Sequence, residues 1–458
     1  MDIDPQLRDF LTSFRTIAEL AARTQAQDVP LLVDALTEHL GVPATQAAVV
    51  AKEIVAYRYA DYDVALERMA GPDAGLLGLG GGDQRHHMSL ADMIGADWAR
   101  VPLGQVDWTN VPINATETRR ALSLGIRLFS YQGQPVAVLQ RRRSRMHGNG
   151  TGVIEVLCAD ADVANALLEE ATTSSTRDSL LRGNIISLEL SGFEGEGDGY
   201  RFLPRPHVGA EDVILPPGVL DRVSGHVVGI AEHAATLRAH GQHLKRGVLL
   251  YGPPGTGKTH TVRHLLSVTP GHTAMLLSGA TLQMVGQATA IARHLQPAIL
   301  VLEDCDLVAM QRDLTPGGNP LLFEVLDAID GLAADADVAF LLTTNRVDVL
   351  EEALAQRPGR VDLSVEIPLP DEAARRRLLE LYGRAVGFGA ATLDDLARRS
   401  DERTASFFKE LVRRAVLYAA EAGEEPADAH LVAAFEALQA DRAELQHRTD
   451  SGFYEEER

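Results

Sequence analysis

The stretch that decides the fold is Gly252-Pro253-Pro254-Gly255-Thr256-Gly257-Lys258-Thr259. It fits the pattern G-x-x-x-x-G-K-[ST], in which the backbone N–H groups of a glycine-rich loop surround phosphate oxygens. An apolar run precedes it and a helical pattern follows, so the loop leads into a helix N-terminus, where an anion is favoured. We predict that Lys258 reaches the outer phosphates and that Thr259 offers its hydroxyl to Mg²⁺. We include the next residue, His260, among the nucleotide-binding residues.

Two further apolar runs end in polar side chains. Residues 298–302 lead into Glu303 and Asp304, and residues 338–342 lead into a Thr-Thr-Asn sequence that ends at Asn345. Fully apolar runs of this length are typical of buried parallel strands. Phosphoryl transfer to water needs one carboxylate near Mg²⁺ and a second one that orients and deprotonates the water. We assign Glu303 to the metal, Asp304 to the water, and the Asn345 amide to the γ-phosphate or the water.

Two arginines follow in the sequence Arg357-Pro358-Gly359-Arg360-Val361-Asp362. A guanidinium keeps its charge and matches a phosphoryl group with two parallel hydrogen bonds. An arginine supplied by a neighbouring copy would accelerate hydrolysis by ~10³–10⁵. The alternative is a loop arginine in a surface ion pair.

Together these motifs resemble the AAA family of ring-forming ATPases over roughly residues 210–440. The resemblance implies an α/β fold with a P-loop sheet of five parallel strands, a C-terminal helical lid, and ATP with Mg²⁺ as ligands. It implies a homo-oligomeric ring of six or seven copies that acts on a protein client. Within that ring Asn345 corresponds to the first sensor, Arg357 to the arginine finger and Arg360 to a second residue acting in trans.

The chain departs from the family pattern in ways that point to a subgroup. The acidic pair has the order Glu303-Asp304, whereas most members have Asp followed by Glu. The chain is similar in this respect to the AAA translocase of the Rieske iron–sulfur protein, although it lacks that subgroup's membrane helix. Met284-Val285-Gly286 stands where threading motors carry an aromatic pore loop, and an ordinary apolar turn is an equal alternative. The helix that follows is also short.

The rest of the chain predicts several further domains. Hydrophobic spacing predicts strands at 126–129, 136–139, 153–157 and 185–190, the first two forming a hairpin. Arg141-Arg142-Arg143-Ser144-Arg145 reads as a solvated loop, or as a docking patch for an acidic partner. The predicted domains are a helical bundle (1–70), a glycine-rich flexible linker (71–97), a small α+β domain (98–200), the large ATPase subdomain (205–370), the helical lid (371–440) and a polar tail (441–458).

Composition limits the class of protein. The chain has 458 residues and a net charge of −21, which disfavours binding to a phosphate backbone. No apolar run approaches the ~20 residues of a membrane helix, and no secretory signal is visible, so we expect a cytoplasmic protein. Cys158 and Cys305 lie in apolar runs and are expected to be buried and unreactive. The preferred function is a protein-remodelling motor, with a nucleotide-gated scaffold and a nucleic-acid-linked ATPase as alternatives.

Overall fold

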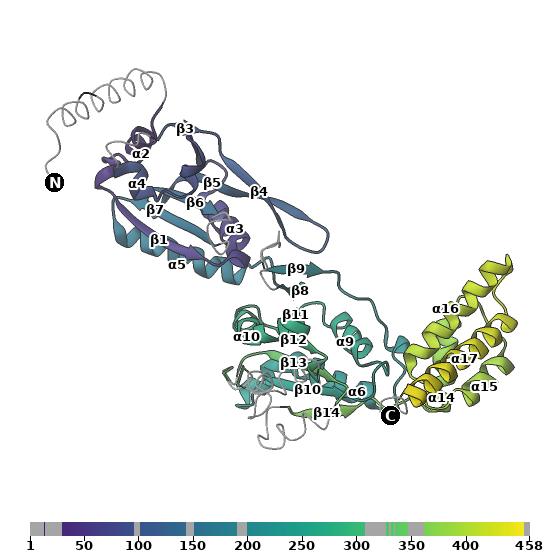
Figure 1. The fold of residues 1–458 in the computed structure, drawn as a ribbon. Coiled ribbons are helices and arrows are strands. Elements are labelled where there is room, and N and C mark those ends of the chain that lie inside the picture. Colours follow the sequence, from purple (N-terminus) through teal and green to yellow (C-terminus); the bar gives the residue numbers. More distant parts are fainter. Residues whose placement is uncertain are drawn as a thin grey trace. The chain divides into compact units, whose positions relative to one another are not determined.

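A computed structural model gives the fold (Figure 1), and the chain divides into two compact units, Met1–Leu180 and Leu181–Arg458. We describe each unit by itself. The structure describes residues 13, 30–95, 101–142, 151–189, 199–306, 327–328, 331–333, 335–346 and 361–452.

The first unit is built on an antiparallel sheet with the strand order β1-β7-β6-β5-β2-β3, in which β4 also pairs with β5. The predicted hairpin is confirmed: Tyr131 of β5 pairs with Gln134 of β6. The turn residues Gln132 and Gly133 have φ angles of 50° and 77°, as a two-residue hairpin turn requires. The strands are β1 (Ala48–Ile54), β2 (Gly75–Leu79), β3 (Leu103–Gly104), β4 (Asp107–Pro112), β5 (Thr118–Tyr131), β6 (Gln134–Arg142) and β7 (Gly152–Cys158).

Helices cover both faces of this sheet. Val136 and Val138 of β6 pack with α3 (Tyr59–Ala70) and α5 (Ala161–Arg177). The alternate residues Ala137 and Leu139 pack with α2 (Leu32–Leu40) and α4 (Leu90–Gly95) on the other face. Successive side chains of a strand point to opposite faces, so burial on both sides explains why residues 136–139 of β6 are all apolar.

The predicted helical bundle over 1–70 is wrong in one part. Residues 48–54 lie within that bundle, but they form β1, which pairs antiparallel with β7. The β-branched pair Val49 and Val50 favours a strand once a partner is present, and that partner lies about a hundred residues later. Most of residues 1–29 lie outside the described residues.

The predicted flexible linker over 71–97 is also wrong, because it contains β2 and α4. Its glycines permit close approach of two strands. A Cβ added to Gly78 would lie 2.2 Å from the carbonyl carbon of Gln105, and one added to Gly104 would lie 2.7 Å from Gly80. Glycine density in this segment therefore reflects tight packing of β2 against β3.

Two expectations for the α+β domain are corrected. The run 185–190 was assigned to it, but β8 (Ile185–Leu188) pairs parallel with β11 in the second unit. The arginine cluster was read as a loop, but Arg141 lies in β6, is 3% exposed and pairs with Glu155 at 2.8 Å. Arg141 is therefore unavailable to a partner, and residues 143–145 lie outside the described part.

The second unit contains the predicted P-loop sheet, in the order β14-β10-β13-β12-β11-β8-β9. The five predicted parallel strands are β14, β10, β13, β12 and β11. Parallel β8 and antiparallel β9 extend the sheet beyond this prediction. The strands are β9 (Tyr200–Leu203), β10 (Arg246–Tyr251), β11 (Thr273–Ser278), β12 (Ala298–Glu303), β13 (Val338–Thr344) and β14 (Leu363–Glu366). Arg205, just after β9, anchors this extension by donating to the backbone oxygens of Gly183, Leu266, Thr269 and His272.

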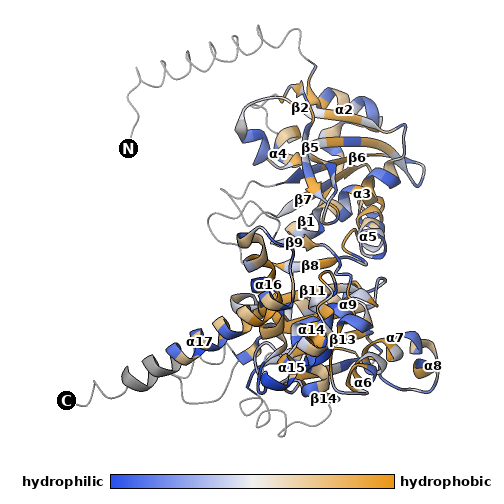
Figure 2. Cartoon of the chain, turned by 90° about the vertical axis from the view of Figure 1, so that its right-hand side faces the viewer, coloured by the Kyte–Doolittle hydropathy of each residue, from blue (hydrophilic) through white to orange (hydrophobic). Residues whose placement is uncertain are grey.

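The helices of the second unit flank the sheet and build the predicted lid. Those beside the sheet are α6 (Val219–Ser224), α7 (Ile230–Glu232), α8 (Ala234–Ala239), α9 (Lys258–Ser267) and α10 (Val285–His294). Those of the lid are α14 (Glu372–Gly383), α15 (Ala390–Arg399), α16 (Ala405–Ala422) and α17 (Asp428–Gly452). Helix α17 is banded in the two hydropathy colours of Figure 2, and its residues Leu431 and Phe435 are buried in the lid core. It continues to Gly452, well into the predicted polar tail.

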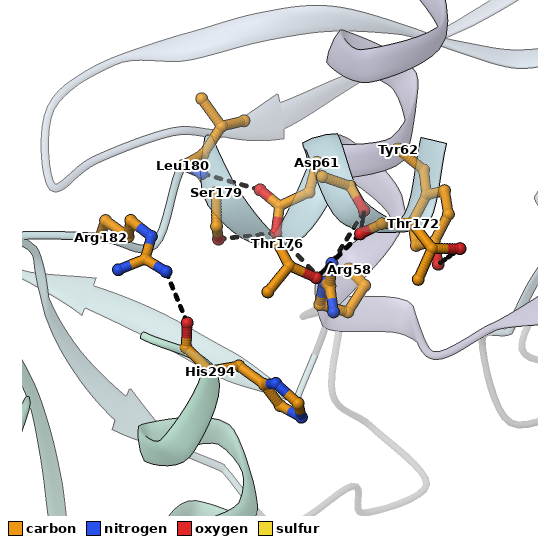
Figure 3. Close-up of polar contacts among 10 residues, drawn as sticks. Arg58, Asp61, Tyr62, Thr172, Thr176, Ser179, Leu180, Arg182 and His294 are labelled. Carbon is orange, nitrogen blue, oxygen red and sulfur yellow. Dashed lines mark hydrogen bonds and ion pairs between the residues drawn. The ribbon is translucent and has the colours of Figure 1, made fainter. Parts of the chain in front are cut away.

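Hydrogen bonds hold the chain on each side of the division between Leu180 and Leu181 (Figure 3). In the first unit the buried carboxylate of Asp61 accepts from the Ser179 hydroxyl and the Leu180 N–H, both at 2.7 Å. In the second unit Arg182 donates to the backbone oxygen of His294 at 2.6 Å. It also donates to the backbone oxygen of Gln296 at 2.7 Å. A search of the described residues found no helix long and apolar enough to span a membrane.

Candidate nucleotide site

The glycine-rich loop joins β10 to α9, and its glycines adopt backbone angles that other residues avoid. Gly252, Gly255 and Gly257 have φ angles of 143°, 76° and 117°. A Cβ on Gly252 would lie 2.2 Å from the backbone oxygen of Ile367. Gly257 forms the N-cap of α9, so the loop delivers its backbone directly to a helix N-terminus.

Lys258 closes the loop on itself. Its side-chain nitrogen donates to the backbone oxygens of Gly252 and Pro253, both at 2.8 Å. The Thr256 hydroxyl donates to the same Pro253 oxygen at 2.9 Å. Burial lowers the pKa of Lys258, while Asp304 and Asp306 act in the opposite direction. The loop is therefore a preformed cradle with a cation inside it, which fits a phosphate group.

The acidic end of β12 meets the start of α9. Burial raises the pKa of Glu303, and a hydrogen bond with the Thr259 side chain acts against this rise. A hydroxyl and a carboxylate in contact are the hard oxygen ligands that Mg²⁺ prefers. Thr259 and Glu303 therefore fit the metal position that the sequence analysis gave them.

The ends of β12 and β13 are joined by polar contacts. The two strands pair in parallel, so their carboxyl ends lie at the same edge of the sheet. Asp304 has a left-handed φ of 51°, and its backbone N–H donates to the Thr343 hydroxyl at 3.0 Å. The Asn345 N–H donates to the Asp306 carboxylate at 3.1 Å. The structure thus brings the predicted water-activating carboxylate and the predicted sensor to one edge.

Residues 248–369 match the family described as "ATPase family associated with various cellular activities (AAA)". The chain carries an AAA domain. It is 34% identical to the 26S protease regulatory subunit 6A of Caenorhabditis elegans over 177 residues, which cover 35% of this chain and 41% of that protein. It is 33% identical to the 26S proteasome regulatory subunit 8 of the same organism over 168 residues, covering 34% and 40% of the two chains.

A third relative of the AAA domain is the 26S proteasome regulatory subunit 6A of Encephalitozoon cuniculi (strain GB-M1). It is 34% identical over 171 residues, covering 34% of this chain and 42% of that protein. The chain thus spans about two fifths of the length of these curated relatives. None of the three is a Rieske-protein translocase, so the resemblance to that subgroup stays a prediction.

The lid contacts the loop of the AAA domain directly. The Ser406 N–H, in the first turn of α16, donates to the backbone oxygen of Gly255 at 3.1 Å. A Cβ on Gly255 would lie 2.3 Å from the Ser406 hydroxyl and 3.2 Å from that of Thr404. The sequence analysis placed Ser406 within the lid (371–440), but the sequence gives no signal for this contact, because about 150 residues separate Gly255 from Ser406.

His260 is occupied by a backbone partner. Its Nε2 lies 3.1 Å from the backbone oxygen of Asp212, and His264, one turn later, places its Nδ1 2.9 Å from that of Val208. Both rings therefore hold the segment 208–212 against α9. The structure supports a packing role for His260 and shows no feature that requires it to bind a nucleotide.

The predicted pore triplet of the AAA domain lies at a helix start. Met284 ends a 3₁₀ turn, and Val285 is the first residue of α10 and only 1% exposed. Val285 is therefore part of the core and cannot contact a polypeptide, which corrects the expectation for this residue. Met284 is half-buried and Gly286 is exposed. Arg357 and Arg360 lie outside the described residues.

Both cysteines behave as expected. Cys158 is fully buried in the first unit and Cys305 is 6% exposed beside the acidic strand end. Burial, with a smaller contribution from Asp306, raises the pKa of Cys305 to about 12. A thiol with such a pKa stays protonated and has little nucleophilic character.

Proposed function

We propose that this chain binds and hydrolyses ATP with Mg²⁺ and works as a ring-forming motor that remodels or translocates a protein client. The observation that supports it best is the convergence of a loop, a metal position and a sensor. Lys258 and the loop amides would hold the phosphates, while Thr259 and Glu303 would hold Mg²⁺. The metal, when bound, neutralises charge on the phosphates.

Asp304 acts as the base for the attacking water, and the neutral amide of Asn345 binds the γ-phosphate or that water without adding negative charge. Asp is one methylene shorter than the Glu found in most family members, so we expect slow turnover. Arg357 of a neighbouring copy completes the site, with Arg360 as a second contributor. This arrangement requires a homo-oligomer, and a hexamer and a heptamer both fit the proposal.

A protein client is favoured over a nucleic acid on two grounds. The relatives are named as regulatory subunits of the 26S protease or proteasome. The net charge of −21 also repels a phosphate backbone. Turnover that rises on addition of DNA or RNA would contradict this choice.

The nucleotide-gated scaffold remains a second candidate because of one specific observation. Val285, the central residue of the predicted pore triplet, is buried, so the grip expected of a threading motor is reduced. ATP turnover without displacement of any client would favour the scaffold.

The test is release of phosphate from Mg-ATP by the full-length protein. Lys258→Ala is expected to abolish release because it removes the cation of the phosphate cradle. Arg357→Ala is expected to abolish release but to keep nucleotide affinity, because that residue acts on the neighbour's site. Adding the Lys258→Ala protein, which keeps its arginine, should then restore part of the activity of Arg357→Ala. Full activity of Arg357→Ala alone would refute the ring.

A further inference from the structure

Asp306 is a buried carboxylate that the proposed reaction does not use. It is 7% exposed and lies just beyond β12. It accepts hydrogen bonds from the Thr344 hydroxyl at 3.2 Å, the Asn345 N–H at 3.1 Å and the Asn345 side-chain amide at 3.5 Å. All three donors belong to the end of β13, so this single carboxylate organises that strand end.

In a second contact between the same two strand ends, the donor lies after β12 and the acceptor lies in β13. The fully buried hydroxyl of Thr343 accepts from the Asp304 N–H at 3.0 Å. Asp304 has a φ of 51°, a conformation that non-glycine residues adopt only where the surroundings hold them. The Thr343 hydroxyl supplies such a restraint at the residue that would carry the base.

The chemistry of Asp306 also decides which way the Asn345 amide faces. An ionised carboxylate only accepts hydrogen bonds, so the amide must turn its NH₂ group towards Asp306. Its oxygen and second N–H then face away from Asp306. A neutral amide at position 306 could donate as well as accept, and both orientations of Asn345 would then be satisfied.

We propose that Asp306 and Thr343 form a strand-end clamp: two positioning residues that hold the Asp304 carboxylate and the Asn345 amide in one fixed arrangement. The inference depends on the proposed ATP hydrolysis and names residues to which that proposal gave no role. The clamp acts mainly on the chemical step, because neither residue belongs to the loop that holds the nucleotide and the Asp306 charge reaches Lys258 only through space.

The experiment compares Asp306→Asn and Thr343→Val with the wild-type full-length protein. Each substitution nearly preserves side-chain volume; the first removes the charge that orients Asn345 and the second removes the acceptor for Asp304. We expect kcat to fall roughly tenfold to a hundredfold in each, somewhat less than the full loss of an oriented transition-state group. The Kd for a fluorescent ADP analogue should rise less than about twofold, since that nucleotide lacks the γ-phosphate assigned to Asn345 and loss of the Asp306 charge does not weaken the attraction of Lys258 for phosphate.

A matched control is Thr289→Val, which removes a buried hydroxyl that donates only within α10, to the Val285 oxygen at 2.8 Å. This variant should keep both kcat and Kd. Glutamate at position 306 restores the charge, so Asp306→Glu should recover more of kcat than Asp306→Asn does. A purely structural role would predict that kcat and Kd deteriorate together with the melting temperature.

The possible outcomes separate the two proposals. Wild-type turnover with unchanged kcat in both variants would overturn the clamp and leave the ATPase intact. A loss of nucleotide affinity in parallel with kcat would also overturn it, because the residues would then be structural. Wild-type protein that binds Mg-ATP without hydrolysing it would refute the proposed function, and the positioning role would fall with it.

Discussion

Gly255 lies against the first turn of lid helix α16, and Gly255→Ala tests how closely lid and loop are coupled. The new Cβ would lie 2.3 Å from the Ser406 hydroxyl, a distance that forces one of them to move. The φ of 76° adds a penalty of about 1–2 kcal/mol for a residue with a Cβ. Moving α16 away would break the hydrogen bond from the Ser406 N–H to Gly255, which contributes about 0.5–1.5 kcal/mol.

The two effects together amount to about 1.5–3.5 kcal/mol, or roughly tenfold to 300-fold in the opening equilibrium of the lid's first turn. Hydrogen exchange measured by mass spectrometry on peptides covering residues 404–411 reports that opening directly. A peptide from β7 in the first unit serves as the internal reference. In Gly255→Ala the lid peptide should exchange faster by that factor, while the β7 peptide should be unchanged.

A second substitution separates the clash from the backbone strain. Ser406→Ala removes the hydroxyl that the new Cβ would meet but keeps the N–H that bonds Gly255. In the Gly255→Ala background, Ser406→Ala should slow hydrogen exchange of the lid peptide. Exchange should stay faster than in the wild type, because the backbone strain at φ 76° remains. If Gly255→Ala exchanges like the wild type, or if Ser406→Ala fails to slow it, the coupling through this contact is refuted.

Three further predictions concern other parts of the second unit. Asp337→Ala leaves the fully buried Arg246 guanidinium without its carboxylate at 2.7 Å and should cost about 3–5 kcal/mol of stability in denaturant, whereas exposed Asp335→Ala should cost almost nothing. Burial raises the pKa of Glu303 above 4.5, so its contribution to stability is full below that pH and is lost as pH rises through the folded-state pKa. Metal-free Glu303→Gln should therefore be more stable than the wild type at pH 7, and a gap that fails to close towards pH 4 would contradict this. Asp304→Glu should lower the melting temperature and give no gain in kcat, because glutamate tolerates the left-handed backbone less well than aspartate.

The sequence predicted which strand ends meet at the candidate site, because parallel strands follow a simple rule. The runs before Glu303 and Asn345 are apolar throughout, which indicates strands covered on both faces, and β12 and β13 are indeed buried. Since the carboxyl ends of parallel strands lie at one edge, polar residues directly after the runs had to lie close together. The glycine-rich loop is also predictable from local sequence alone, because its pattern requires a strand before it and a helix after it, here β10 and α9.

The errors share a cause, which is that their partners lie far away in the chain. Val49 and Val50 form a strand through pairing with β7, and Ile185 pairs with Ala274 of β11, nearly ninety residues later. Gly78 lies in a segment that has the composition of a flexible linker, but in the structure a glycine is required by the close approach of the Gln105 backbone. The sequence gives no signal for Asp306 for the same reason, because its hydrogen-bond partners Thr344 and Asn345 lie at the end of another strand.

The unusual order Glu303-Asp304 has a local physical explanation. Among non-glycine residues, aspartate and asparagine accept a positive φ most readily, and position 304 has a φ of 51°. A glutamate there would reach further but would strain the backbone that Thr343 holds. Aspartate at position 304 therefore has a shorter side chain than glutamate, but its backbone is held in one conformation by the Thr343 hydroxyl. Under the proposed mechanism, a base without the extra methylene depends more on the Thr343 hydroxyl and the Asp306 carboxylate for its position.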